Sequence, residues 1–364
     1  MKKFIIMLMS VCVIASVVPV VKACHFRKNV SSAKSEALIT QQKTKILPTM
    51  DSEVANGNTI WVGTFQIVWN EVIDNIVKGP LEFVGGTNDT GKSLNKREFN
   101  KTDISEDSYY TKFGIVSPKL KKEIETGIKE KFNETSDIFG LIDFTYDPQK
   151  MLIYAMLKKD FKFLEAFEKL DEETFGTNPK KVKYFGVKAD SSYKLYKNLT
   201  ALFYNSEDDY AVKLHTKSND EVILYRTDDV KKLNEYFEDI KTKSDKYEGE
   251  KYFGHNDRFK VPEISLYEIT NFKEVEGKSI KGTDFRIDKT IETIDFKMDN
   301  EGVKLKSEAA MMMATSAAPG FRPQIRYFYF NKNFVLFLIE KDKNVPYFAM
   351  RVVDVAKLNE TGKN

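Results

Sequence analysis

The chain has 364 residues, of which 41% are hydrophobic and 13% aromatic, so it can bury a sizeable core as one large domain or two small ones. This composition excludes a largely disordered chain, which would need fewer aromatic residues and a larger net charge. The 57 basic and 54 acidic side chains leave a formal charge of +3, which favours neither nucleic acid nor a membrane surface as a partner.

The first 23 residues have the pattern of a secretory signal peptide. Lys2 and Lys3 form a basic start, residues 4–21 form an apolar run, and Val21 and Ala23 supply small residues before a cleavage point. The apolar run is long enough to span a bilayer, so a permanent membrane anchor is the alternative. We expect residues 1–23 to be removed on export.

Cys24 ends a Val-Lys-Ala-Cys sequence that resembles a bacterial lipobox, in which the cysteine carries a lipid. The protein is therefore expected to be secreted, or lipid-anchored through Cys24 at the outer face of a bacterial cell membrane. We expect residues 24–50 to form a flexible tether and residues 51–364 a single domain. Because Cys12 lies in the leader, the mature chain keeps one cysteine at most and forms no internal disulfide.

Residues 86–93 read GTNDTGKS and match the phosphate-cradling pattern G-x-x-x-x-G-K-[ST] letter for letter. Residues 81–84 before it could be a strand, but the LNKREFNKTD that follows is a short and polar helix at best. A turn rich in Gly, Asn, Asp and Thr is the simpler interpretation. Phosphate binding through this loop and Lys92 stays a remote alternative.

The middle of the chain predicts a mixture of helices and short strands. Residues 59–77 begin as a strand and become an amphipathic helix, with Trp61 and Trp69 as core anchors, and residues 118–132 form a second amphipathic helix. A helix over residues 229–242 is capped by Asp229. Strands are expected over residues 151–157, 182–187, 201–204, 210–214, 221–225 and 259–266, the last an edge strand because it contains Pro262.

Near the C-terminus the side chains alternate in type, as in a half-buried strand. In residues 293–298 the inward positions are Ile294, Phe296 and Met298, whereas after Gly302 the inward parity is odd. The strand is therefore expected to turn near Gly302, and a second strand can run back over residues 303–313. The small, polar residues 314–323 then predict an exposed loop. Closing strands follow over residues 327–330, 334–339 and 346–355, with residues 334–339 buried on both faces.

From residue 150 to residue 358 the order of these sequences resembles that of serpins. Residues 330–358 resemble the closing strands of that family, although Asn333 replaces its Pro and Ala349-Met350 replace its Met/Leu-Gly. Residues 151–175 resemble its Leu-Val-Asn-Ala-Ile-Tyr-Phe strand, with Ala155 keeping the Ala. The resemblance implies an α+β fold with a large mixed or antiparallel central β-sheet, further sheets and surrounding helices.

Two short sequences resemble the hinge of serpins, namely Asn300-Glu301-Gly302 and Ser307-Glu308-Ala309-Ala310. In serpins this hinge precedes a reactive loop that a target protease cleaves and that then inserts into the central sheet as a new strand. The resemblance implies a hinge made of Glu301, Gly302, Val303, Leu305, Ser307, Glu308, Ala309 and Ala310. It places the scissile region at Gly320, Phe321 and Arg322, where Pro323 disfavours cleavage after Arg322.

The resemblance implies a monomeric inhibitor of a serine or cysteine protease, without enzymatic activity, cofactor or metal. Leu305 and Met311 are large for such a hinge, and overpacking costs about 1–3 kcal/mol, which would slow insertion. The alternative is a non-inhibitory cell-surface binding protein on the same fold, with residues 303–313 permanently in the sheet. His215 and His255 are interpreted as ordinary surface or core residues, since no catalytic or metal-ligand spacing surrounds them.

Overall fold

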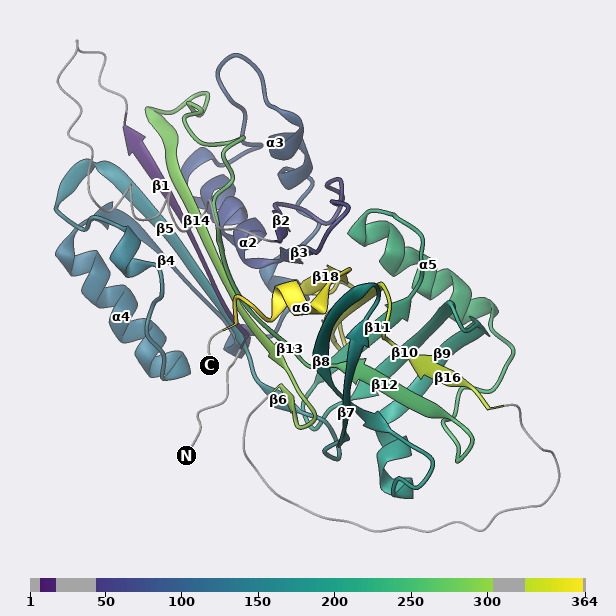
Figure 1. The fold of residues 1–364 in the computed structure, drawn as a ribbon. Helices are drawn as coiled ribbons and strands as arrows, with labels where there is room; N and C mark the ends of the chain where they lie inside the picture. The colour runs from purple at the N-terminus through teal and green to yellow at the C-terminus, as the bar shows by residue number, and fades with distance from the viewer. Residues whose placement is uncertain (1–6, 18–43, 304–324, 363–364) are drawn as a thin grey trace.

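A computed structural model describes residues 7–17, 44–303 and 325–362 of the chain. Within these residues four β-sheets form, with five, seven, four and two strands, and helices cover the faces of the larger ones (Figure 1). The expected α+β class, with one large sheet, further sheets and surrounding helices, is confirmed. None of the helices in the described residues combines the length and apolar character needed to cross a membrane.

The five-stranded sheet has every neighbouring pair antiparallel. Its order is β13 (Ile264–Thr270), β14 (Phe285–Met298), β1 (Met7–Val17), β5 (Asp147–Lys159) and β4 (Tyr109–Val116). Since β5 and β14 are both antiparallel to β1, they run in the same direction, and their carboxyl ends lie at one end of the sheet.

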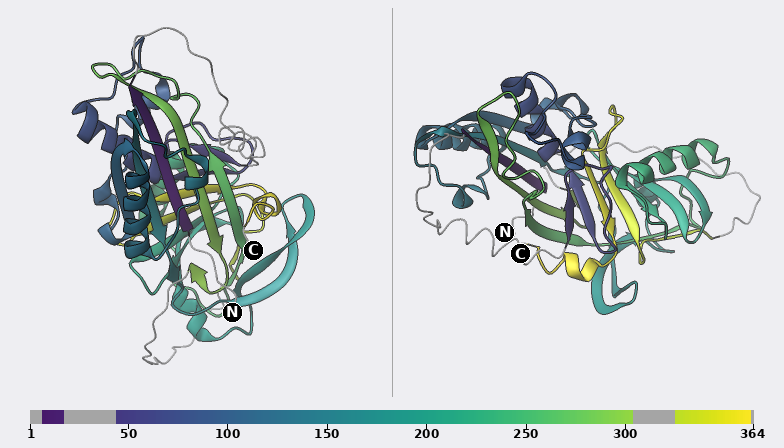
Figure 2. Two further views of the ribbon diagram at one scale, coloured as in Figure 1. Left: turned by 90° about the vertical axis from the view of Figure 1, so that its left-hand side faces the viewer. Right: turned by 90° about the horizontal axis from the view of Figure 1, so that it is seen from above.

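Strand β1 comes from the segment that the sequence predicts to be a signal peptide. It lies in the middle of the five-stranded sheet, where Figures 1 and 2 show it as the purple strand between β14 and β5. An export signal needs an apolar run, and such a run also suits a strand buried on both faces. The signal peptide stays a prediction, because β1 is seen here in a chain from which residues 1–23 have not been removed.

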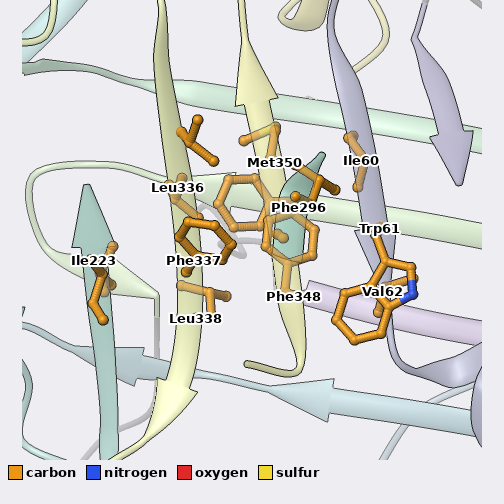
Figure 3. Packing of buried hydrophobic residues seen from close by; sticks show 14 of the residues in the cluster. Ile60, Trp61, Val62, Ile223, Phe296, Leu336, Phe337, Leu338, Phe348 and Met350 are labelled. Carbon is orange, nitrogen blue, oxygen red and sulfur yellow. The ribbon is translucent and has the colours of Figure 1, made fainter. Parts of the chain in front are cut away.

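The seven-stranded sheet contains the strand that the sequence predicts to be buried on both faces. That strand, β17 (Phe334–Glu340), has all of its residues buried and pairs with β11 (Asp220–Arg226) and β18 (Phe348–Val352). The sheet is completed by β2 (Lys45–Leu47), β3 (Thr59–Val62), β10 (Asp209–His215) and β9 (Leu199–Ser206). Figure 3 shows the side chains of this core, in which the stacked rings of Phe296 and Phe348 join the two large sheets.

The prediction of one edge strand over residues 259–266, around Pro262, is wrong. The chain forms β12 (Arg258–Pro262) and then β13, which belong to different sheets. β12 lies inside the four-stranded sheet, between β16 (Tyr327–Tyr329) and β8 (Asn178–Val187), with β7 (Glu168–Phe175) beyond. Proline is tolerated because it ends β12, and only β13 lies at an edge.

Two predicted helices have different outcomes. α4 (Pro118–Phe132) has the predicted bounds, because the Ser117 hydroxyl accepts the Leu120 amide and Pro118 takes the first helical position. α5 (Leu233–Lys246) begins four residues later than predicted, so Asp229 is not its cap. Instead the Glu235 carboxylate accepts the Lys232 amide and begins the helix.

The remaining helices are short or deeply buried. α2 (Thr64–Val72) follows β3 as predicted but is buried on all sides rather than amphipathic, and it continues into a π-helical turn over Ile73–Val77. Trp61 and Trp69 are core residues, as predicted. The others are α3 (Asp89–Leu94), α6 (Val355–Leu358) and single turns at Lys101–Asp103, Glu106–Ser108, Phe139–Leu141 and Tyr193–Asn198.

Candidate functional site

The predicted turn at Gly302 is present and is fixed to the rest of the molecule. The Gly302 amide donates to the Asp299 carbonyl at 3.3 Å, and the Glu301 amide donates to the Asp299 carboxylate at 3.0 Å. Gly302 has a φ of +123°, and a Cβ atom there would lie 2.6 Å from the Lys162 Cα. Only glycine fits this position, since it tolerates both the positive φ and the close approach of a second backbone.

After the turn the chain runs back, but not beside β14. β15 (Gly302–Val303) pairs antiparallel with β6 (Phe161–Lys162), the short strand that directly follows β5. The Asn300 carbonyl also accepts the Phe167 amide at 2.8 Å. The start of the predicted hinge is thus already hydrogen-bonded in line with β5, at the carboxyl end of the five-stranded sheet.

The five-stranded sheet is covered on both faces where β1 runs through it. α2 packs against β1 and β5 on one face (Figure 1). On the other face the buried side chains of α4 form one cluster with Tyr154 of β5 and Ile291 of β14, the strands on either side of β1. In the register, Val11 lies opposite Ala155 of β5 and Glu292 of β14, and Cys12 lies opposite Tyr154 and Ile291. Each of these four partner residues is at most 1% exposed.

Glu292 is unusual because it is a carboxyl group with no exposed surface in the middle of β14. Neither of its carboxylate oxygens makes a hydrogen bond with the side chains and backbone that the structure describes. Burial raises the pKa of the Glu292 carboxyl well above its ordinary value. Burial in a low-dielectric medium disfavours the charged form, so the group is held neutral.

A buried ionic cluster lies where β5 ends. The Lys159 ammonium contacts Glu340 of β17 and lies 2.9 Å from Asp220 of β11, while the Tyr347 hydroxyl donates to Asp220 at 3.0 Å. Burial alone would raise the pKa of Glu340, but hydrogen bonds from Lys159 and Ser105 lower it overall. The cluster joins the end of β5 to the seven-stranded sheet, beside a cavity of about 360 Å³.

The phosphate-loop pattern at residues 86–93 has a local structural role. Where a strand over residues 81–84 was expected, only an isolated bridge between Phe83 and Ile280 forms. The Asn88 side chain accepts the Gly91 amide and caps α3, and Lys92 pairs with Asp89 at 3.1 Å on the surface. The motif borders a hollow of about 1040 Å³ lined by residues 44–48 and 270–274. Within the motif, the amides of Gly91 and Lys92 donate to Asn88, and the Lys92 side chain pairs with Asp89.

The two histidines in the described residues make local contacts within the fold. His215 lies in β10, where its Nε2 is 2.8 Å from the Thr200 hydroxyl and burial lowers its pKa. His255 packs against the rings of Tyr193 and Tyr196. No group of three or more His, Cys, Asp or Glu residues in the described part of the chain is arranged to hold a metal ion.

Several predicted site residues lie outside the described residues. They are the lipidation candidate Cys24, the scissile region Gly320, Phe321 and Arg322, and the hinge positions Leu305, Ser307, Glu308, Ala309 and Ala310. Of the hinge, the structure places Glu301, Gly302 and the backbone of Val303. Sequence reasoning missed β1, although its unbroken apolar run was a signal for a strand buried on both faces.

No family model matches the chain, and no curated protein matches it. Solved structures that it resembles include Serpin48 of the insect Tenebrio molitor, with 13% identity over 90% of this chain and 99% of that one and a TM-score of 0.46. The thermophilic serpin Tengpin in its native state matches with 13% identity over 92% and 96% and a TM-score of 0.47. The mouse protein-Z dependent protease inhibitor matches with 14% identity over 83% and 92% and a TM-score of 0.49. Many of the solved structures to which this chain is similar are serpins, the family that its sequence resembles.

Proposed function

We propose that the protein is a serpin-like protease inhibitor that offers the loop after Gly302 to a serine or cysteine protease. Cleavage in the region of Gly320, Phe321 and Arg322 would release the hinge segment to enter the five-stranded sheet. The observation that carries the proposal is β15. It leaves the turn at Gly302 already paired with β6, in line with β5 and at the end of the sheet where a returning strand would begin.

The hinge residues have physical roles in this proposal. Gly302 lets the backbone pass within contact distance of β6, and Glu301 begins the turn through its amide. The side chains of Val303, Leu305, Ser307 and Ala309 would share one face of the inserted strand, because strand residues alternate. Glu308 and Ala310 would share the other face.

The test is incubation of the chain without residues 1–23 with a panel of serine and cysteine proteases, followed by denaturing electrophoresis. Inhibition predicts a covalent complex that survives SDS, with the fragment after the scissile bond released. Clean cleavage within residues 304–324 by every protease that cuts there, without any such complex, would reject inhibition. Lipid labelling of the wild type against Cys24→Ser decides between the proposed lipid anchor and simple secretion.

A second function, a non-inhibitory binding protein on the same fold, is favoured by β1. A strand already lies between β5 and β14, so the sheet of the described chain offers no open place for another. A relaxed protein of this kind would gain no thermal stability when its loop is nicked, whereas a metastable inhibitor would. Melting curves recorded before and after nicking separate the two functions.

A further inference from the structure

We propose that Met7–Val17, while it remains attached, fills the strand position that the loop after Gly302 would enter and so holds the protein in a non-inhibitory state. This inference rests on the proposed function and gives the predicted leader a second role. The unprocessed chain is locked, and removal of the leader frees the position.

β1 runs in the direction that a strand returning from the turn at Gly302 would take. β1 is antiparallel to β14 and begins near its carboxyl end, where Leu8 lies opposite Asp295. The turn at residues 299–302 lies just beyond that end. A strand that left the turn and ran back beside β14 would also be antiparallel to it and would begin at the same end. β1 and such a strand would therefore have the same orientation in the same gap.

Register makes the overlap specific. Gly302 lies opposite Lys162 and Val303 opposite Phe161, so each further residue of this segment would move one place back along the chain toward β5. By this count residue 305 reaches Lys159, which is the partner of Met7 in the structure. Residues 305–314 would then take the places of residues 7–16. The two segments cannot occupy the sheet together.

The surroundings explain why an apolar leader fits this position. Both faces of the sheet are covered here, so a strand in the gap must bury both of its faces. The sequence MLMSVCVIASV has no charged residue. Its backbone pairs along ten residues with β5 and along ten with β14, and it satisfies the inner hydrogen-bonding edges of both strands. Without β1 those two edges would be open.

Cys12 provides a direct test of the position of β1 in the full-length chain. Its partner in β14 is Ile291, and directly opposed strand residues have Cα atoms within the range that a disulfide bridges. In a Cys24→Ser background, Ile291→Cys should cross-link to Cys12 on mild oxidation. Ile287→Cys is the matched control, since it is an equally buried isoleucine of β14 that lies opposite Ala15. It should stay reduced. Equal cross-linking of the two variants, or none, would overturn the proposal without reference to any protease.

The locking itself is tested by expelling β1 from the sheet. Val11→Asp places a charge opposite Ala155 and Glu292 in the covered sheet, whereas Val11→Ile keeps the strand apolar. Added to the Cys24→Ser, Ile291→Cys chain, Val11→Asp should abolish the Cys12 cross-link. Introduced alone, it should form the SDS-stable protease complex and melt at a higher temperature after its loop is nicked. Val11→Ile should keep the cross-link, form no complex and melt unchanged after nicking.

The remaining outcomes separate this inference from the proposed function. If both variants form the complex equally, the protein is an inhibitor and β1 does not lock it. If Val11→Asp loses the cross-link but neither forms a complex nor gains stability on nicking, both the inhibitory function and the locking role are rejected. A Val11→Asp chain that keeps the cross-link shows that the strand is not displaced by charge, and it contradicts the exchange of strands on which the inference depends.

Discussion

The two large sheets have centres of different character. The central strand of the seven-stranded sheet, β17, is apolar along six of its seven buried residues, and its one charged residue, Glu340, is paired with Lys159. In the five-stranded sheet, β14 buries Thr290, Glu292 and Thr293 beside β1. The first centre is a permanent core that fixes the fold. The second centre buries polar groups beside the strand position that we propose changes its occupant.

The largest expected effect comes from breaking the ionic cluster that joins the two sheets. Lys159→Met leaves Glu340 and Asp220 buried without their cation, and the loss of one partner from a buried ion pair costs about 3–5 kcal/mol. The free energy of unfolding in urea measures this. Lys158→Met, at a less buried neighbour paired with Glu134, should cost much less. A double variant with Glu340→Gln should recover part of the loss, and no recovery would argue against the pairing.

The next largest loss of stability is expected from creating a cavity in the core of the seven-stranded sheet. Leu336 in β17 has no exposed surface, and truncation of such a leucine to alanine costs about 2–5 kcal/mol. Chemical denaturation of Leu336→Ala should show this loss with an unchanged m-value. The control is Leu164→Ala, because that side chain is 37% exposed. Similar losses at the two positions would contradict the view that this core carries the stability of the fold.

A smaller effect is expected at the hinge. Gly302→Ala introduces a Cβ atom that meets the backbone of Lys162 at a positive φ, and such strain costs about 1–3 kcal/mol. Gly140→Ala, where nothing lies near the added atom, is the control. Hydrogen exchange at the Phe163 amide, which donates to the Glu301 carbonyl, should accelerate only in the hinge variant. Unchanged protection there would mean that β15 does not depend on Gly302.

Glu292 should make the stability of the protein depend on pH, and this effect is limited to part of the pH range. Its pKa is raised above the ordinary value of 4.5, so between that pH and the raised pKa the folded state holds a proton that the unfolded state has lost. The stability contributed by the neutral group is therefore fully present below pH 4.5 and falls as the pH rises above it. Glu292→Gln should flatten this slope and be more stable than the wild type at alkaline pH. Thermal melts across the pH range measure both, and parallel curves for the two proteins would contradict the burial of the carboxyl group.

Local patterns determined a large part of this fold. The cap at Ser117 and the proline after it define α4, and six successive apolar residues define β17, because these signals act within a few residues of each other. The turn at Gly302 was likewise readable from its Asp, Asn and Gly. The start of α5 was not, because the Glu235 carboxylate, which accepts the Lys232 amide, competed with Asp229 for the helix start.

By itself, the sequence determined the α+β class, the closing strands, the hinge turn and the resemblance to serpins. Only the tertiary structure decided that Met7–Val17 lies between β5 and β14, and that β15 pairs with β6, the short strand that follows β5. Strand pairing joins residues far apart in the chain, and the apolar pattern of β1 is shared by an export signal, a membrane span and a buried strand. The choice among them depends on which open edges the rest of the molecule presents, and no local pattern carries that information.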